Sequence, residues 1–164
     1  DEQRRLCNKL VSWLDITSNY RKECMDEAIV RTDRLMKMKK YSNLFKAGGE
    51  ELKEAVVLLW YYYGYPKGKK AIPKLLEDLS KVYARYKIAI RDYAMRRTRI
   101  EPEIPSSPAY ELVKLLKQQK ETTKAYSINR WLRHKREEAE EKLAKISRTK
   151  IKKKTKTKTK TKKR

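Results

Sequence analysis

The sequence predicts an all-α protein, a bundle of four to six helices with a basic C-terminal tail that is disordered or becomes ordered on a partner. Its 164 residues include only four glycines and five prolines, and these cluster, which leaves long stretches without helix breakers. Within those stretches apolar residues recur at helical spacing. The final Lys/Thr segment cannot bury enough apolar surface to fold alone. We therefore expect a helical domain over residues 1–146 and a tail over 147–164.

The apolar pattern places long helices at about residues 2–15, 18–40, 50–63, 72–98 and 108–146, with a weak point in the last near 122–127. In the first helix one apolar face is formed by Leu6, Leu10, Trp13 and Leu14. The second follows a capping Thr17 or Ser18. The side chains of this helix that are expected to face inward are Tyr20, Cys24, Ala28, Leu35 and Met38.

The third helix is expected after Gly48-Gly49, and it is apolar almost all round from Val56 to Tyr63. A helix of this kind is buried, either in the chain's own core or against a neighbouring subunit. The residues predicted to be core or subunit interface are Val56, Leu59, Trp60 and Tyr63. The aromatic run could also act as a base-stacking platform, but its apolar surroundings favour burial.

Glycines and prolines in GYPKGKK predict a turn, after which Pro73 suits the first turn of the fourth helix. The apolar stripe of that helix comprises Ile72, Leu75, Leu76, Leu79, Val82, Tyr83, Tyr86, Ile90 and Tyr93. The segment EPEIPSSP predicts an irregular connector, and Ser107-Pro108 opens the last helical stretch.

Charge is the strongest functional signal. The chain carries 44 Lys and Arg against 21 Asp and Glu, a formal net charge of +23. Residues Arg148–Arg164 hold 11 of these bases and no acid, and the preceding residues have a net charge of +12. A protein this basic repels itself unless a partner neutralises it. Nucleic acid is the commonest such partner; an anionic membrane surface and an acidic protein are the alternatives.

Basic residues on the expected helices and in the tail are the candidate phosphate contacts, because Arg and Lys bind phosphate through charge-assisted hydrogen bonds. On helices they are Arg31, Arg34, Lys37, Lys39, Lys40, Arg91, Arg96, Arg97, Arg99, Arg130 and Arg133, with Lys135 and Arg136 beside them. In the tail they are Lys152, Lys153, Lys154, Lys156, Lys158, Lys160, Lys162, Lys163 and Arg164. The alternatives are an ordinary solvated helix face and a solubilising or localisation tail.

In an extended tail, alternate lysines would recur every ~6.6 Å, which is close to two base-pair rises of ~3.4 Å. Such contacts carry no base readout, because phosphates position a protein and base edges specify the sequence. The pattern therefore predicts binding to double-stranded nucleic acid without sequence specificity.

Signals for catalysis are missing from the sequence. His134 is the only histidine, it lies in a charged helix, and it is far in sequence from Cys7 and Cys24, which are expected to be buried thiols. GYPKGKK lacks the spacing of a phosphate-binding loop. We therefore predict a protein that is not an enzyme and takes no cofactor, metal or small-molecule substrate. No apolar run is long enough for a membrane span, and no signal peptide is visible.

These features together resemble the helical major capsid proteins of rod-shaped and filamentous archaeal DNA viruses. The resemblance is architectural and covers residues 1 to about 146: a short all-helical chain, basic in body and tail, rich in Lys, Arg and Glu, with a very apolar helix at Val56–Tyr63. It implies a subunit that dimerises and coats linear duplex DNA in many copies. The Lys-Thr tail departs from that plan, and no motif assigns binding residues.

The leading hypothesis is thus a DNA-coating subunit of a virion that forms homo- or hetero-oligomers. The alternatives are a ribosomal or other ribonucleoprotein component that binds RNA as a single copy, a chromatin or nucleoid protein, and a minor structural virion protein whose tail touches acidic protein. The ribonucleoprotein and chromatin alternatives place the chain in the cytoplasm, nucleoid or ribosome instead of the virion. The sequence leaves open the choice of DNA or RNA and the copy number.

Overall fold

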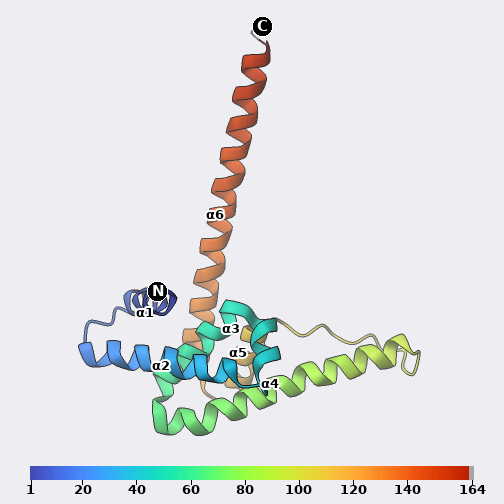
Figure 1. Ribbon diagram of the computed structural model, residues 1–164. Coiled ribbons are helices and arrows are strands. Elements are labelled where there is room, and N and C mark those ends of the chain that lie inside the picture. The colour runs from blue at the N-terminus through green and yellow to red at the C-terminus, as the bar shows by residue number, and fades with distance from the viewer. Residues whose placement is uncertain (163–164) are drawn as a thin grey trace. The chain divides into compact units, whose positions relative to one another are not determined.

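The computed structural model describes the backbone of residues 1–162 and the side chains of residues 1–152, and it is all-helical over that range (Figure 1). The six helices are α1 Glu2–Trp13, α2 Asn19–Lys37, α3 Ser42–Tyr63, α4 Tyr65–Ala94, α5 Pro108–Gln118 and α6 Thr122–Lys162. The prediction of an all-α fold is confirmed. The chain forms two compact units, Asp1–Ile128 and Asn129–Arg164.

Helix α3 is the centre of the first unit, where it packs against α2, α4 and α5, while α1 packs against α2. Its residues Leu52, Val56, Leu58 and Leu59 are completely buried. Val56, Leu59 and Trp60 therefore belong to the core of this chain, and the alternative of a subunit interface does not apply to them. Tyr63, at the end of α3, is half-buried.

Helix α3 starts eight residues earlier than its apolar pattern predicts, because the glycine pair forms a kink within it. Gly49 has φ 60° and ψ −150°, a left-handed backbone conformation that glycine adopts without steric cost. The chain is helical on both sides of this residue. Gly48-Gly49 thus separates two helical segments, as expected, but the first segment was not predicted.

Helix α4 also starts early, at Tyr65, so the expected turn over GYPKGKK is wrong. Gly64 alone breaks the chain, with φ 75° and ψ 170°, and Pro66 occupies the first turn of the helix. Gly68 is helical and buried, and a Cβ there would lie 2.7 Å from a ring carbon of Trp60. This glycine therefore allows α4 to approach α3 closely, and Pro73 lies inside the helix.

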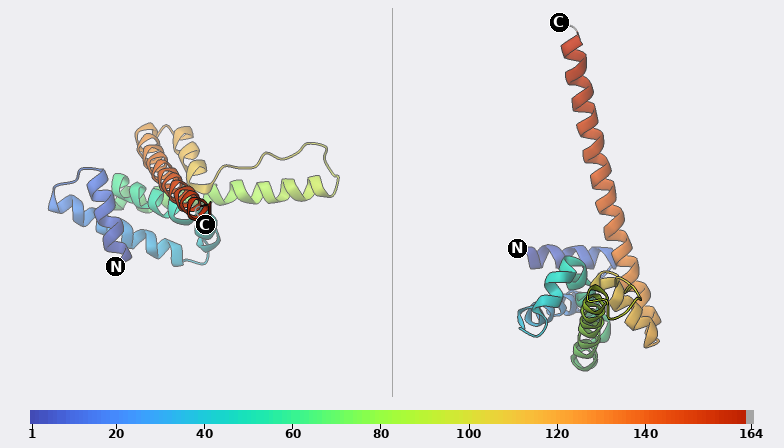
Figure 2. Two further views of the ribbon diagram at one scale, coloured as in Figure 1. Left: turned by 90° about the horizontal axis from the view of Figure 1, so that it is seen from above. Right: turned by 90° about the vertical axis from the view of Figure 1, so that its right-hand side faces the viewer.

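The second half of α4 extends beyond the other helices of the first unit (Figures 1 and 2). Its buried face ends at Leu79, although the apolar stripe continues. Ile90 is 42% exposed and Tyr93 is 43% exposed, so the outer part of the predicted apolar stripe lies outside the core. We call residues 82–106, the outer part of α4 and the connector that returns along it, the arm.

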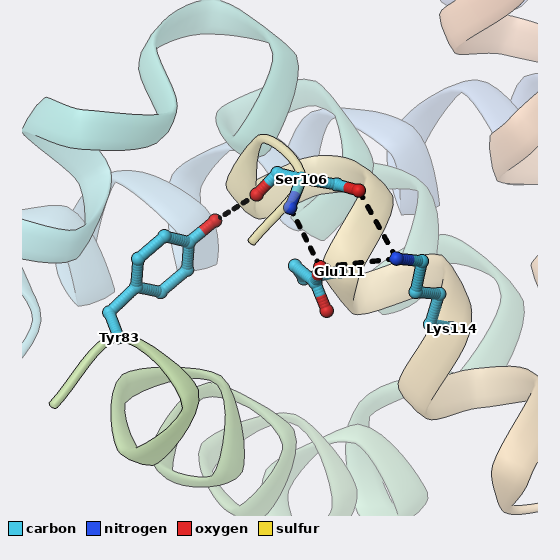
Figure 3. A network of polar contacts seen from close by, with 4 residues as sticks. All are labelled: Tyr83, Ser106, Glu111 and Lys114. Atoms are coloured by element: carbon cyan, nitrogen blue, oxygen red, sulfur yellow. Dashed lines mark hydrogen bonds and ion pairs between the residues drawn. The ribbon is translucent and has the colours of Figure 1, made fainter. Parts of the chain in front are cut away.

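A polar network attaches the returning connector to the base of the arm (Figure 3). The Tyr83 hydroxyl donates to the carbonyl oxygen of Ser106. The Ser106 N–H donates to Glu111 Oε1 at 2.8 Å, and Lys114 Nζ donates to Ser106 Oγ at 3.1 Å and to Glu111 Oε1 at 3.3 Å. Three elements are thereby joined: α4, the connector and α5.

Tyr83 should make the stability of the first unit sensitive to alkaline pH. Burial, with a smaller contribution from the Glu111 carboxylate, raises the pKa of Tyr83 from 10.0 to about 12. The unfolded state then loses the Tyr83 proton first, so this residue's stabilisation is complete below pH 10 and is lost between pH 10 and about 12. We expect Tyr83→Phe to flatten the fall in unfolding free energy between pH 9 and 11.5, measured by urea denaturation. An unchanged slope would contradict this.

Three helices end with a non-glycine residue in the left-handed region, a consequence of a chain poor in glycine. The residues are Asp15 (φ 54°), Arg96 (φ 57°) and Lys120 (φ 63°). After α4, for example, the Arg97 N–H donates to the Asp92 carbonyl at 2.9 Å and the Arg96 N–H to the Tyr93 carbonyl at 3.1 Å. This pair of bonds is the Schellman C-cap, which satisfies the last carbonyls of the helix. The cap at Lys120 separates α5 from α6, just before the predicted weak point.

In α2 the buried face differs from the one predicted. It includes Met25, Ala28, Ile29, Thr32 and Leu35. Tyr20 is 74% exposed and Met38 is 48% exposed, so both assignments to the interior are wrong. Tyr20 lies in the first turn on another side of the helix, and Met38 follows its last residue with an extended backbone. Apolar character alone did not identify the side of α2 that meets α1 and α3.

Helix α6 continues to Lys162, whereas the sequence predicts a boundary at residue 147 and an unfolded tail when no partner is bound. The physical reason is that neither glycine nor proline occurs after Pro108, and lysine is a good helix former. A helix that is already nucleated upstream extends without a second nucleation cost. In a helical backbone, the ~6.6 Å spacing expected of an extended tail does not apply. Lys163 and Arg164 lie outside the described residues.

Candidate nucleic-acid interface

The first basic cluster lies where α2 ends and turns toward α3. Arg34, Lys37, Lys39 and Lys40 are all exposed there. Arg34 and Lys37 occupy the last turn of α2, where the helix dipole favours positive charge. Lys40 Nζ lies 5.6 Å from the centre of the Tyr41 ring. The cluster therefore offers four accessible cations on one short segment.

Arg31, the fifth candidate in this region, is held by the chain itself. Its guanidinium forms an ion pair of 2.8 Å with Glu27. It also lies over the ring of Tyr65, at 4.4 Å, and near that of Trp60, at 5.7 Å. A cation stacked and paired in this way ties α2 to the end of α3 and the first residue of α4, and it has little capacity left for phosphate.

Acidic groups lie beside part of the α2 cluster. Arg34 and Lys37 line a hollow of about 650 Å³ that also contains Asp1, Glu2 and Asp33. Asp33 accepts a hydrogen bond of 2.5 Å from the Gln3 side chain. It also forms an ion pair with Lys53, with 3.3 Å between the charged atoms. The local field around Arg34 is therefore less positive than the run of bases in the sequence implies. Lys39 and Lys40 lie outside this hollow.

The second cluster is at the outer end of the arm, where Arg91, Arg96, Arg97 and Arg99 are exposed. Arg97 lies 3.8 Å from Asp92, and with side chains 64% and 35% exposed this pair is worth little energy. The arginines share this end with exposed apolar side chains. The most exposed of these are Ile100, at 79%, and Met95, at 57%.

The third cluster lies in the second unit, on α6. Arg133 is exposed, whereas Arg130, Lys135 and Arg136 already take part in interactions within the chain. His134 lies 3.3 Å from Glu138 at helical spacing and contacts the ring of Trp131. This portion mixes acids with bases, and its net field is therefore modest.

Farther along α6 the acids stop. Glu141 is the last acidic residue of the chain, and Lys145 lies 4.0 Å from it. Every residue from 142 to 152 is exposed. We call the cationic side chains of this segment the α6 basic stretch, and they are Lys142, Lys145, Arg148, Lys150 and Lys152.

Sequence reasoning identified Lys152 as a site residue but did not select the four bases before it. The available signal was the absence of acids after Glu141. The assumed boundary at residue 147 separated Lys142 and Lys145 from the acid-free segment that follows it. The remaining tail candidates are Lys153, Lys154, Lys156, Lys158, Lys160, Lys162, Lys163 and Arg164, whose side chains lie outside the described part of the structure.

The aromatic run at the end of α3 serves the packing of the first unit. Trp60 is buried, and Tyr61 and Tyr62 meet edge to face with ring centres 5.5 Å apart. Tyr63 lies under the ammonium group of Lys124, 4.5 Å from its ring centre. Burial raises the pKa of both Tyr61 and Tyr63. The half-buried tyrosines keep their hydroxyl groups at the edge of the core, where phenylalanine would offer no polar atom.

Other chemical features of the described residues are few. Cys7 is buried and Cys24 is half-buried, and both are free thiols. Burial, followed by the Asp26 side chain, raises the pKa of Cys7 to about 12. No group of three His, Cys, Asp or Glu suited to a metal ion occurs within the described range. No helix in that range is long and apolar enough to cross a membrane.

Comparison with protein-family models, with curated proteins and with solved structures finds no match to this chain.

Proposed function

We propose that this protein is a structural nucleic-acid-binding protein that coats double-stranded DNA in many copies without sequence specificity, as the nucleoprotein subunit of a virion. The observation that supports this most directly is the α6 basic stretch. It presents five exposed cations on a helix with no acid after Glu141. Such a helix matches the continuous negative charge of a duplex backbone.

A helix of this kind binds through phosphate contacts. Because DNA presents a negative charge every ~1.7 Å along its axis, cations that follow one another along one side of a helix find partners in any register. At ~3.6 residues per turn, Lys142, Lys145, Arg148 and Lys152 share one side of α6, and Lys150 lies on the other. Phosphate contacts fix position but do not read bases, so the binding is independent of sequence. The exposed bases Lys39 and Lys40 on the first unit provide a second, separate contact.

The proposal is tested by neutralising charges in the full-length chain after nucleases and high salt have removed bound polymer. The variant Lys145→Gln/Arg148→Gln/Lys152→Gln removes three cations from one side of the α6 basic stretch. If all three contact phosphate, the slope of log K against log salt should become shallower by about 2.7, at about 0.9 per contact. Binding to a random-sequence duplex is measured by fluorescence anisotropy at several salt concentrations.

The matched control is Lys74→Gln/Lys81→Gln/Lys117→Gln, which alters net charge equally at exposed positions elsewhere. It should leave the slope within about 0.5 of the parent value, since distributed charge adds little to direct contacts. Equal slopes for the two triple variants would refute the assignment to α6. Preference for double-stranded RNA of matched length over DNA would replace DNA coating by the ribonucleoprotein alternative.

A further inference from the structure

The outer half of α4 carries an apolar face that the chain leaves uncovered. Val82 and Tyr86 are half-buried, and farther out Ile90 is 42% exposed and Tyr93 is 43% exposed. These residues continue the row that buries Leu79 in the core. Figures 1 and 2 show that this half of α4 lies beyond the other helices of the first unit. An amphipathic face of about three turns is thus available to a partner.

The order of residues along this face follows a heptad. Leu79 belongs to the chain's own core and sets the register. Beyond it, positions a and d, which would face a partner helix, are occupied by Val82, Tyr86, Ala89 and Tyr93. Ala89 lies between two large side chains, which suits the packing of knobs into holes. Ile90 flanks the seam on one side. On the other flank lie Arg85 and Asp92, seven residues apart and opposite in charge.

The pair of opposite charges identifies the partner and its direction. In an antiparallel pair of α4 helices, equivalent flanks run beside each other, so Arg85 of one copy lies near Asp92 of the other, and the contact occurs twice. In the same arrangement Tyr86 lies beside Ala89 of the other copy. In a parallel pair, Arg85 and Asp92 of one copy would instead lie beside the other flank of the second copy, which carries Ile90.

We propose that the arm is a self-association surface, on which a second copy of this chain packs its α4 antiparallel to the first. Asp92 is 35% exposed, and its contact within the chain, Arg97, lies at 3.8 Å on the same exposed arm, so the carboxylate can accept a second cation. The net charge of +23 opposes pairing of free chains. At ~0.15 M salt this long-range repulsion is largely screened beyond ~8 Å, whereas direct contacts are screened less.

This inference deepens the proposed coating function, for which it supplies the contact between subunits, but its test needs no DNA. Sedimentation velocity of nucleic-acid-free, full-length protein is measured at ~0.15 M salt over a range of concentrations. We expect a concentration-dependent dimer. In an Arg85→Asp dimer, the new aspartate of each copy lies beside Asp92 of the other. In an Asp92→Arg dimer, the new arginine of each copy lies beside Arg85 of the other. Each repulsion should weaken the dimer about tenfold.

The decisive measurement is the mixture of the two single variants. Antiparallel pairing places the aspartate introduced at position 85 of one variant beside the arginine introduced at position 92 of the other, and the retained Asp92 beside the retained Arg85. The mixture should therefore form a heterodimer about as stable as the parent dimer, and so should the double variant Arg85→Asp/Asp92→Arg with itself. If the mixture stays monomeric, or the parent chain is monomeric throughout, the proposal fails.

A matched pair of isoleucines tests the apolar face. Ile90→Glu should weaken the dimer about tenfold or more, because it puts a charge beside the seam. Ile88→Glu should change it less than about twofold, because residue 88 is 53% exposed on the opposite side of the helix. Equal effects of the two changes on dimerisation would overturn the proposal. Binding of anionic vesicles that both changes abolish, without any dimer, would assign the arm to a lipid surface instead.

Discussion

Raising the salt concentration from about 50 to about 200 mM is expected to weaken duplex DNA binding by about 10³- to 10⁵-fold, if 6–10 phosphates are contacted per subunit. The physical reason is counterion release, because each neutralised phosphate frees a bound cation and added salt opposes that release. The exposed cations of the α6 basic stretch, together with Lys39 and Lys40, can supply contacts of this number.

Equilibrium titrations against two duplexes of equal length and unrelated sequence measure this effect. The two salt dependences should coincide, because phosphate contacts carry no base information. A tight complex that is insensitive to salt would show that apolar or base-specific contacts dominate, and it would contradict the coating function. A clear preference for one of the two sequences would also contradict it.

The second large effect concerns stability. Leu59→Ala is expected to lower the free energy of unfolding by about 2–5 kcal/mol, because Leu59 is completely buried in α3 and its truncation leaves a cavity. The helix contacts three others, so the surrounding structure has little freedom to collapse into the space. Urea denaturation followed by circular dichroism measures the change.

Leu143→Ala in α6 is the matched control. Leu143 is 66% exposed, so the same truncation there should change stability by less than about 0.5 kcal/mol. A small effect of Leu59→Ala would mean that α3 is not the core of the folded chain.

The apolar periodicity of the sequence determined that the protein is all-helical and that α3 is buried. A helix that is apolar on every side cannot remain in water, so burial of Val56, Leu59 and Trp60 followed from composition alone. Breaks at Gly64 and in the proline-rich connector could also be predicted, because their backbone preferences are local. The positions of helix starts were less certain, as Gly68 shows. A helical glycine packed against Trp60 has the same sequence signature as a glycine in a turn.

Tertiary packing alone decided which apolar and basic side chains remain exposed and can contact a partner. Tyr20 and Ile90 satisfy the same helical pattern as buried residues, yet no other element covers them. Arg31 and Arg34 are equivalent in sequence, but only Arg31 is held by Glu27, Tyr65 and Trp60. The sequence by itself thus determined the fold class and the excess of positive charge, since both arise from residue type and local spacing. Which side chains face the core and which face a partner depended on how the helices pack, and that depends on contacts between residues far apart in the chain.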